Sequence, residues 1–415
     1  MRLTYYKFTT YIEKIFRVDA RYFLHGGFWL TLTQAIVIIA GIATTALFAH
    51  FLSETNYGVY RYLIGLAVIF SSFSLTGLGQ AILQTSAKKY YAFYQETIKI
   101  NFVYSLGISL VGTLGGIYYL FNNNTILALG CVLIAFIQPI VNSYQYIPAF
   151  LQGRREFHKS TTVQSIKVIL VSTISIITLL LSQSVIFLFL SYLLSQAVIN
   201  YLSHFFYKKA VTVATPSNIY REYVSYAKHT SLRNIIFSIS NRLDVIIVFT
   251  QIGAAGLAIY TIATVVPEQL KASFKNLASL LLPKYASSVD IEKNKRALPR
   301  RTIQLFLLLC LVTVTYIFVA PTFYKIIFPK YEEAIFLSQI TALAFPSFAF
   351  LVPYSFFQAT KDERKLYEIT LYGSILQLVS VIFLVLGFGL MGAILAKIIY
   401  RYFVLFISIK NLYTN

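Results

Sequence analysis

Long apolar segments alternate with short polar connections along the whole chain. A transmembrane helix needs about 20 mainly apolar residues, and these segments have that length. The pattern therefore predicts an all-α polytopic membrane protein with about 12 transmembrane helices. The predicted spans are residues 28–52, 58–83, 100–121, 125–150, 161–181, 184–206, 229–250, 253–282, 302–320, 334–358, 366–386 and 389–410.

The second half of the chain resembles the first at an offset of roughly 200 residues, which indicates an internal repeat. Tyr57-Gly58-Val59-Tyr60 opens the second span as Leu257-Ala258-Ile259-Tyr260 opens the eighth. Two halves of six spans start on the same side of the membrane, so they form parallel repeats. We expect two six-helix lobes around a central cleft. The predicted segments are a cytoplasmic or interfacial N-terminal segment (1–27), an N-lobe (28–208), a cytoplasmic linker (209–228) and a C-lobe (229–415).

Basic residues are strongly biased to one side of these spans. With the N-terminus inside, almost all Lys and Arg outside the spans lie in inner connections, and the outer side holds only Arg61, Lys325 and Lys330. Inner-side excess of Lys and Arg fixes membrane orientation. The sequence thus predicts a bacterial plasma (inner) membrane protein with cytoplasmic termini. The same bias explains the net charge of +20 without a nucleic-acid partner.

Ionisable side chains inside the spans are costly and usually mark function. Bases outnumber acids there, which predicts a cationic cleft for phosphate, diphosphate or acidic sugar. The predicted substrate-binding residues of this cleft are Arg61, Lys167, Arg242, Lys271, Lys275, Lys397 and Arg401. The two intramembrane acids, Asp244 and Glu268, are candidates to bind a coupling ion, Na⁺ or a proton.

Two readings stay open for the eighth span. Glu268, Lys271 and Lys275 follow the spacing i, i+3 and i+7, so they share one helix face and could line the cleft. Alternatively, Glu268 pairs with Lys271 while Lys275 extends toward the inner interface.

The seventh and twelfth spans raise similar alternatives. The planar guanidinium of Arg242 suits phosphate oxygens. Asp244 binds a coupling ion or pairs with a base on another span, and Lys167 lines the cleft or reaches the interface. Lys397 and Arg401 share a face at i and i+4, so their repulsion predicts an anion, water or acid beside them.

The sequence carries no motif of a metalloprotease, nucleotide-binding loop or nucleophile elbow. Cys131 and Cys310 lie in separate apolar runs, which indicates buried thiols. We therefore expect no enzyme activity, no catalytic residue, no metal site and no cofactor other than the coupling ion.

The chain resembles the polysaccharide-biosynthesis flippases, the O-antigen-type oligosaccharide exporters of the multidrug/oligosaccharidyl-lipid/polysaccharide (MOP) superfamily. The matching residues are Phe51-Leu52-Ser53, Tyr57-Gly58-Val59-Tyr60, Gly77-Leu78-Gly79-Gln80-Ala81, Leu151-Gln152-Gly153, Asp244, Ala258-Ile259-Tyr260 and Leu282-Pro283.

The resemblance implies two lobes facing each other across a V-shaped cleft. It implies export of an undecaprenyl-diphosphate-linked oligosaccharide to the outer leaflet for surface polysaccharide such as lipopolysaccharide. The implied partners are this polyprenyl-diphosphate-linked glycan, membrane lipids, and a polysaccharide polymerase or glycosyltransferases. Related peptidoglycan-precursor flippases imply a diphosphate contact for Arg242 and cation binding for Asp244. The alternatives are a cation-coupled multidrug antiporter of the same superfamily and a non-transporting scaffold for polysaccharide assembly.

Overall fold

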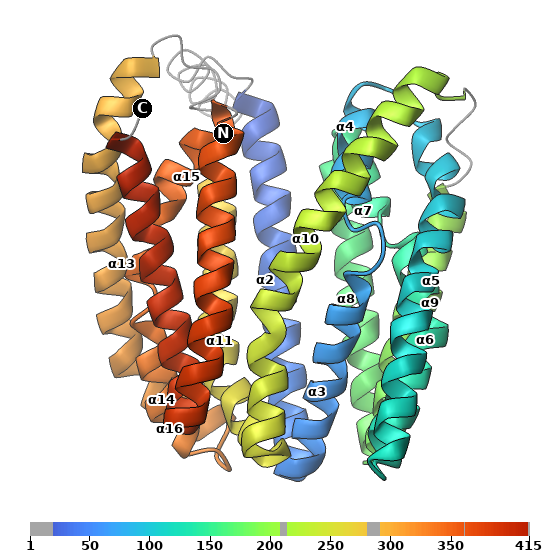
Figure 1. The fold of residues 1–415 in the computed structure, drawn as a ribbon, viewed down its shortest axis with the longest axis vertical. Helices are drawn as coiled ribbons and strands as arrows, with labels where there is room; N and C mark the ends of the chain where they lie inside the picture. Colours follow the sequence, from blue (N-terminus) through green and yellow to red (C-terminus); the bar gives the residue numbers. More distant parts are fainter. Residues whose placement is uncertain (1–19, 208–213, 280–290, 361, 414–415) are drawn as a thin grey trace, which may run out of the picture. The chain divides into compact units, whose positions relative to one another are not determined.

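The computed structural model describes residues 20–207, 214–279, 291–360 and 362–413 (Figure 1). Within these ranges the regular structure is helical, which confirms the all-α prediction. Nine helical segments of the described residues are long and apolar enough to cross a membrane, and the last of them contains two predicted spans. The chain is therefore a multi-pass membrane protein.

The helices follow the predicted spans in order. Up to residue 252 the helices are α2 (Ala20–Phe51), α3 (Glu54–Ser71), α4 (Leu78–Ala87), α5 (Ala92–Phe121), α6 (Thr125–Tyr144), α7 (Ile147–Gly153), α8 (Phe157–Leu181), α9 (Val185–Tyr207) and α10 (Ser217–Ile252). They are followed by α11 (Ala254–Ser279), α13 (Ile291–Ile327), α14 (Glu333–Ala342), the 3-10 helix η2 (Pro346–Phe350), α15 (Leu351–Ala359) and α16 (Glu363–Tyr413).

Three predicted spans are interrupted rather than continuous. The second span is divided into α3 and α4, the fourth into α6 and α7, and the tenth into α14, η2 and α15. Broken helices inside a membrane require neighbouring groups to bind the freed backbone N–H and C=O groups. Hydropathy does not reveal the break in the second span, because side chains that bind its residues lie on α6 and α10.

Helix α16 contains the eleventh and twelfth predicted spans and reverses direction at Gly389 (Figure 1). Gly389 has a φ of +57°, a conformation that glycine adopts without the steric cost of a Cβ atom. A Cβ at Gly392 would lie 1.8 Å from the Leu384 carbonyl oxygen, so the two legs approach closely beyond the turn.

Helix α5 shows how the sequence places polar groups inside and apolar groups outside. Asn101 and Ser105 are buried, whereas Leu110, Leu114 and Phe121 are exposed. In a lipid bilayer the apolar face contacts hydrocarbon and the polar face needs protein partners. The arrangement is the one expected of a membrane-spanning helix.

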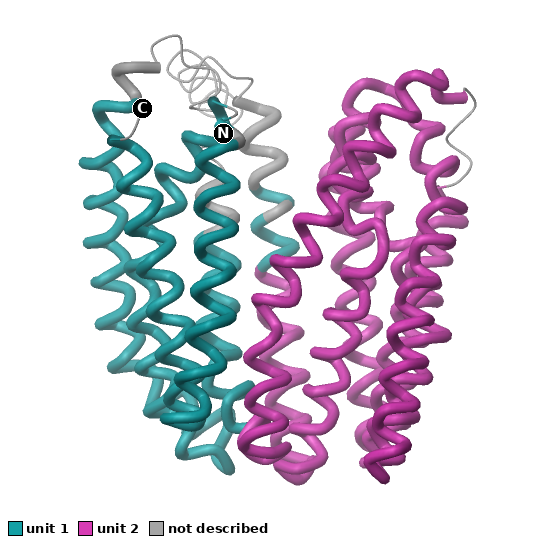
Figure 2. Tube along the Cα trace, viewed as in Figure 1, with its two compact units in different colours: residues 1–34, 259–415 teal, residues 35–258 magenta. Residues whose placement is uncertain are grey.

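The chain forms two compact units (Figure 2). Unit 1 comprises residues 1–34 and 259–415, and unit 2 comprises residues 35–258. Helix α10 belongs to unit 2, where it packs on α3 and α4. The proposed boundaries between N-lobe, linker and C-lobe stay predictions.

Glycines of the second span allow α10 to approach it closely. A Cβ at Gly77 would lie 2.3 Å from the Ala227 carbonyl oxygen, and one at Gly65 would lie 2.8 Å from Val245 Cγ1. The Gly77 N–H also donates a hydrogen bond of 2.9 Å to Ser231 Oγ. Gly77 is thus a point of backbone contact between α4 and α10.

We expect Gly77→Ala to lower the free energy of unfolding by about 1–3 kcal/mol, the usual cost of overpacking. The measurement is unfolding in detergent micelles, followed by circular dichroism. Gly115→Ala is the control, because its Cβ would meet Cys131 Sγ at 3.4 Å, an ordinary contact. Equal stability of the two variants would contradict close packing at Gly77.

Candidate functional site

Four ionisable side chains meet inside unit 1. Helix α11 carries Glu268 and Lys271, and the second leg of α16 carries Lys397 and Arg401. Glu268 Oε2 lies 3.0 Å from Lys271 Nζ, and Glu268 Oε1 lies 3.7 Å from Lys397 Nζ. Arg401 Nη2 donates a hydrogen bond to the same Oε1. The predicted contact between Glu268 and Lys271 is present, and Glu268 is also the acid beside Lys397 and Arg401.

Aromatic rings hold two of these bases in place. The Lys397 ammonium lies 4.9 Å from the ring centre of Tyr260, on α11. The Arg401 guanidinium lies 5.1 Å from the ring centre of Phe348, on η2. Such cation–π contacts are stronger where water is excluded. The cluster therefore joins three segments of unit 1: α11, the interrupted tenth span and α16.

The cluster, defined as Glu268, Lys271, Lys397 and Arg401, contains three bases and one carboxylate. Arg401 is only 4% exposed, and its Nη1 is buried without a hydrogen-bond partner among the described residues. About a third of the Lys271 side chain is exposed. A buried donor without a partner is unfavourable, and charge-assisted hydrogen bonds to phosphate are strong. The cluster thus has donor capacity and charge for an anion.

Lys275 lies one turn beyond Lys271 on α11. Its side chain lies outside the described residues, so its place in a cationic cleft stays a prediction.

The bases and acid predicted from the second and seventh spans lie in unit 2. Arg61 belongs to α3 and Arg242 to α10. Asp244 is 1% exposed, and its Oδ1 accepts a hydrogen bond of 2.9 Å from the N–H of Val245. The roles of Arg61, Arg242 and Asp244 in binding stay predictions.

Polar side chains of α6 surround the break in the second span. Gln138 Nε2 donates hydrogen bonds to Ser71 Oγ at 2.9 Å and to Asn142 Oδ1 at 3.1 Å. Asn142 Nδ2 donates to Ser74 Oγ at 3.0 Å. Ser71 at the end of α3 and Ser74 within the break are thereby held by α6. Sequence reasoning missed this network, although amides within apolar spans were the available signal.

Further contacts stabilise the same break. The Tyr146 hydroxyl donates to the Leu75 carbonyl oxygen at 3.2 Å, and Asn234 Nδ2 donates to Thr76 Oγ1 at 3.2 Å. Tyr146 follows α6, and Asn234 belongs to α10. The irregular segment between α3 and α4 is therefore bound from two sides within unit 2.

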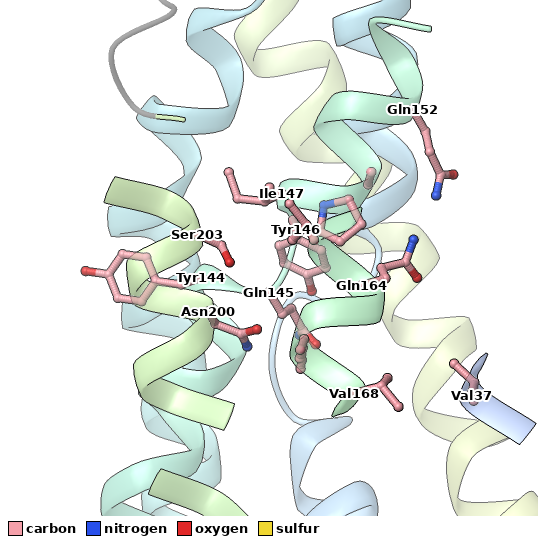
Figure 3. A pocket seen from close by; sticks show the side chains of 14 residues that line it. Val37, Tyr144, Gln145, Tyr146, Ile147, Gln152, Gln164, Val168, Asn200 and Ser203 are labelled. Atoms are coloured by element: carbon pink, nitrogen blue, oxygen red, sulfur yellow. The ribbon is translucent and has the colours of Figure 1, made fainter. Parts of the chain in front are cut away.

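Lys167, on α8, also belongs to unit 2. It lines a cavity of about 410 Å³ bounded by α2, α6, α7, α8 and α9 (Figure 3). Gln145 and Gln164 also line this cavity.

Several apolar helices, outward apolar faces and intramembrane charges define a polytopic membrane protein with polar sites between its spans. Residues 47–335 match the family model described as polysaccharide biosynthesis protein. The match covers more than half of the chain, so the chain belongs to this family. A search of curated proteins finds no match.

Solved structures of a flippase and of two transporters of the MOP superfamily share the fold. The lipid II flippase MurJ, in an inward closed conformation, matches with a TM-score of 0.63 and 13% identity over 92% of this chain and 87% of that chain. A MOP-superfamily transporter from Pyrococcus furiosus matches with a TM-score of 0.61 and 14% identity over 95% of this chain and 97% of that chain. A multidrug resistance transporter of the MATE family matches with a TM-score of 0.58 and 16% identity over 93% of this chain and 94% of that chain. At identities of 13–16%, these matches show that this chain shares its fold with these proteins.

Proposed function

We propose that this protein is a flippase that moves an undecaprenyl-diphosphate-linked oligosaccharide from the cytoplasmic to the outer leaflet. Its transport would serve the synthesis of surface polysaccharide such as the O-antigen of lipopolysaccharide. The observation that carries the proposal is the cluster of unit 1, where three bases surround one carboxylate within the spans. Family membership supports a substrate from polysaccharide biosynthesis.

The cluster suits a diphosphate through its geometry. Glu268 holds the three bases together in the absence of substrate, because each of them contacts its carboxylate. An entering diphosphate binds the free donor of Arg401 and the accessible ammonium of Lys271. Arginine is suited to such oxygens because its planar fork donates two parallel hydrogen bonds.

Export then follows alternating access. The head group enters from the cytoplasmic side while the polyprenyl tail stays in lipid, and the two lobes move to release the head group outside. If the head group carries about two negative charges, an inside-negative potential of roughly 100 mV favours its export by about 4–5 kcal/mol. The membrane potential alone is therefore a sufficient driving force.

The two acids have different surroundings, which favours different roles. Glu268 is engaged with three bases and serves to orient them. Asp244 is buried in unit 2 and stays our candidate for binding a coupling Na⁺ or proton.

The test is complementation of a bacterium that lacks its own O-antigen flippase. Restored surface polysaccharide, lost again with Arg401→Gln, supports the proposal. Absence of polymer despite normal protein in the membrane contradicts it for that glycan. Efflux of cationic drugs by the same cells would instead indicate a multidrug antiporter, and polymer that persists in every cluster variant would indicate a scaffold.

A further inference from the structure

The cavity of unit 2 that Lys167 lines shares no lining residue with the cluster of unit 1. It lies beside the break in the fourth span, where Gln145 and Tyr146 interrupt the path from α6 to α7 (Figure 3). Its volume of about 410 Å³ falls within the range of small-molecule sites, roughly 300–1,000 Å³. A cavity of this size, formed within one unit, has room for a molecular head group.

Lys167 gives the cavity a positive charge. Its ammonium makes no hydrogen bond or ion pair within the part of the chain that the structure describes, and no acidic residue from that part lines the cavity. A cation within the spans without a neutralising acid is costly. An anionic ligand would remove that cost.

Amide groups supply the remaining polarity. Gln164 Nε2 donates to Ser160 Oγ at 3.2 Å, and Asn200 Nδ2 donates to the Val141 carbonyl oxygen at 3.0 Å. These bonds fix both amides and leave their carbonyl oxygens as acceptors. Gln145 adds a further amide to the lining. Fixed acceptors of this kind suit the hydroxyl groups of a polyol.

We propose that this cavity is a second binding site, which takes a phosphorylated polyol head group. Lys167 binds the phosphate, and the amides of Gln145, Gln164 and Asn200 bind the hydroxyls. Two sources share this chemistry: the phosphosugar of a lipid-linked glycan and the glycerophosphate head group of an anionic phospholipid. The first source rests on the flippase function proposed above, whereas the second does not.

Binding to the purified full-length protein tests the proposal. The soluble probe is N-acetylglucosamine 1-phosphate, measured by ligand-observed NMR in detergent. The lipid probe is phosphatidylglycerol, compared with phosphatidylcholine by the thermal stability of the protein in nanodiscs. Saturable binding of the sugar phosphate identifies the glycan source, and stabilisation specific to phosphatidylglycerol identifies the lipid source.

The variants locate the site. Lys167→Gln is expected to weaken binding of whichever probe the native protein binds about tenfold, because a charge-assisted hydrogen bond is lost. Lys167→Arg is expected to retain the native affinity for that probe. Gln164→Leu should also weaken binding. Lys159→Gln is the matched control, because Lys159 is an exposed cation of α8 that pairs with Glu156 at 2.8 Å and does not line the cavity.

These experiments distinguish failure of the cavity-site proposal from failure of the flippase proposal. If neither probe binds, or if Lys167→Gln binds as tightly as the native protein, the cavity site is wrong even where glycan export is intact. If export is absent while phosphatidylglycerol binding depends on Lys167, the flippase proposal fails and the cavity site stands.

Discussion

Replacing Glu268 by glutamine is expected to destabilise the protein by about 3 kcal/mol. The carboxylate contacts three bases, and one of them, Arg401, is 4% exposed. Removing one partner of a buried ion pair leaves an uncompensated charge, which costs about 3–5 kcal/mol. The lower end applies here, since about a third of the Glu268 side chain is exposed. The measurement is unfolding of the purified protein by sodium dodecyl sulfate in mixed micelles.

A second substitution checks the physical reason. Glu268→Gln combined with Arg401→Gln should recover part of the lost stability, with a coupling free energy of about 1–3 kcal/mol. Glu368→Gln is the control, because Glu368 pairs with Arg364, whose side chain is 88% exposed, and such surface pairs contribute about 0–1 kcal/mol. If Glu268→Gln is no more destabilising than Glu368→Gln, the carboxylate does not hold the cluster together.

Replacing Arg401 by glutamine is expected to lower glycolipid export about 10- to 100-fold. Arg401 supplies the buried donor without a partner, Nη1, which we assign to the diphosphate. A hydrogen bond to a charged group contributes about 1.5–3 kcal/mol, and each 1.4 kcal/mol changes a rate about tenfold. The measurement is the initial rate of surface-polysaccharide appearance in complemented cells at equal protein levels.

The same helix provides the control for this prediction. Arg364→Gln removes an exposed guanidinium of α16 and should leave export unchanged. Arg401→Gln should also be less destabilising than Glu268→Gln, because two bases then share the carboxylate. A normal export rate in a stable Arg401→Gln variant would contradict a substrate role for the cluster.

Hydropathy predicted the helical spans because each is a local run of apolar residues. It missed the interruptions of three spans, and the one in the second span depends on side chains far away in sequence. The break after Ser71 is bound by Gln138 and Asn142 of α6 and by Asn234 of α10. A hydropathy average treats such amides as minor exceptions, although each of them needs a partner within the membrane.

Local spacing predicted only part of the candidate site. Glu268 and Lys271 are three residues apart on one helix, so their contact follows from helical geometry. Repulsion between Lys397 and Arg401 indicated an anion or acid nearby, but not its identity. Arg401 and Glu268 are 133 positions apart, and only the packing of α16 against α11 brings them together.

The most direct test of the central claim is translocation by the purified protein. Proteoliposomes would contain the protein and a fluorescent undecaprenyl-diphosphate-linked oligosaccharide, and loss of fluorescence to an external quencher would report the outer leaflet. We predict potential-dependent translocation by the native protein, and a rate about 10- to 100-fold lower for Arg401→Gln than for Arg364→Gln. Translocation at the same rate in protein-free vesicles, or in the Arg401→Gln variant, would contradict the account.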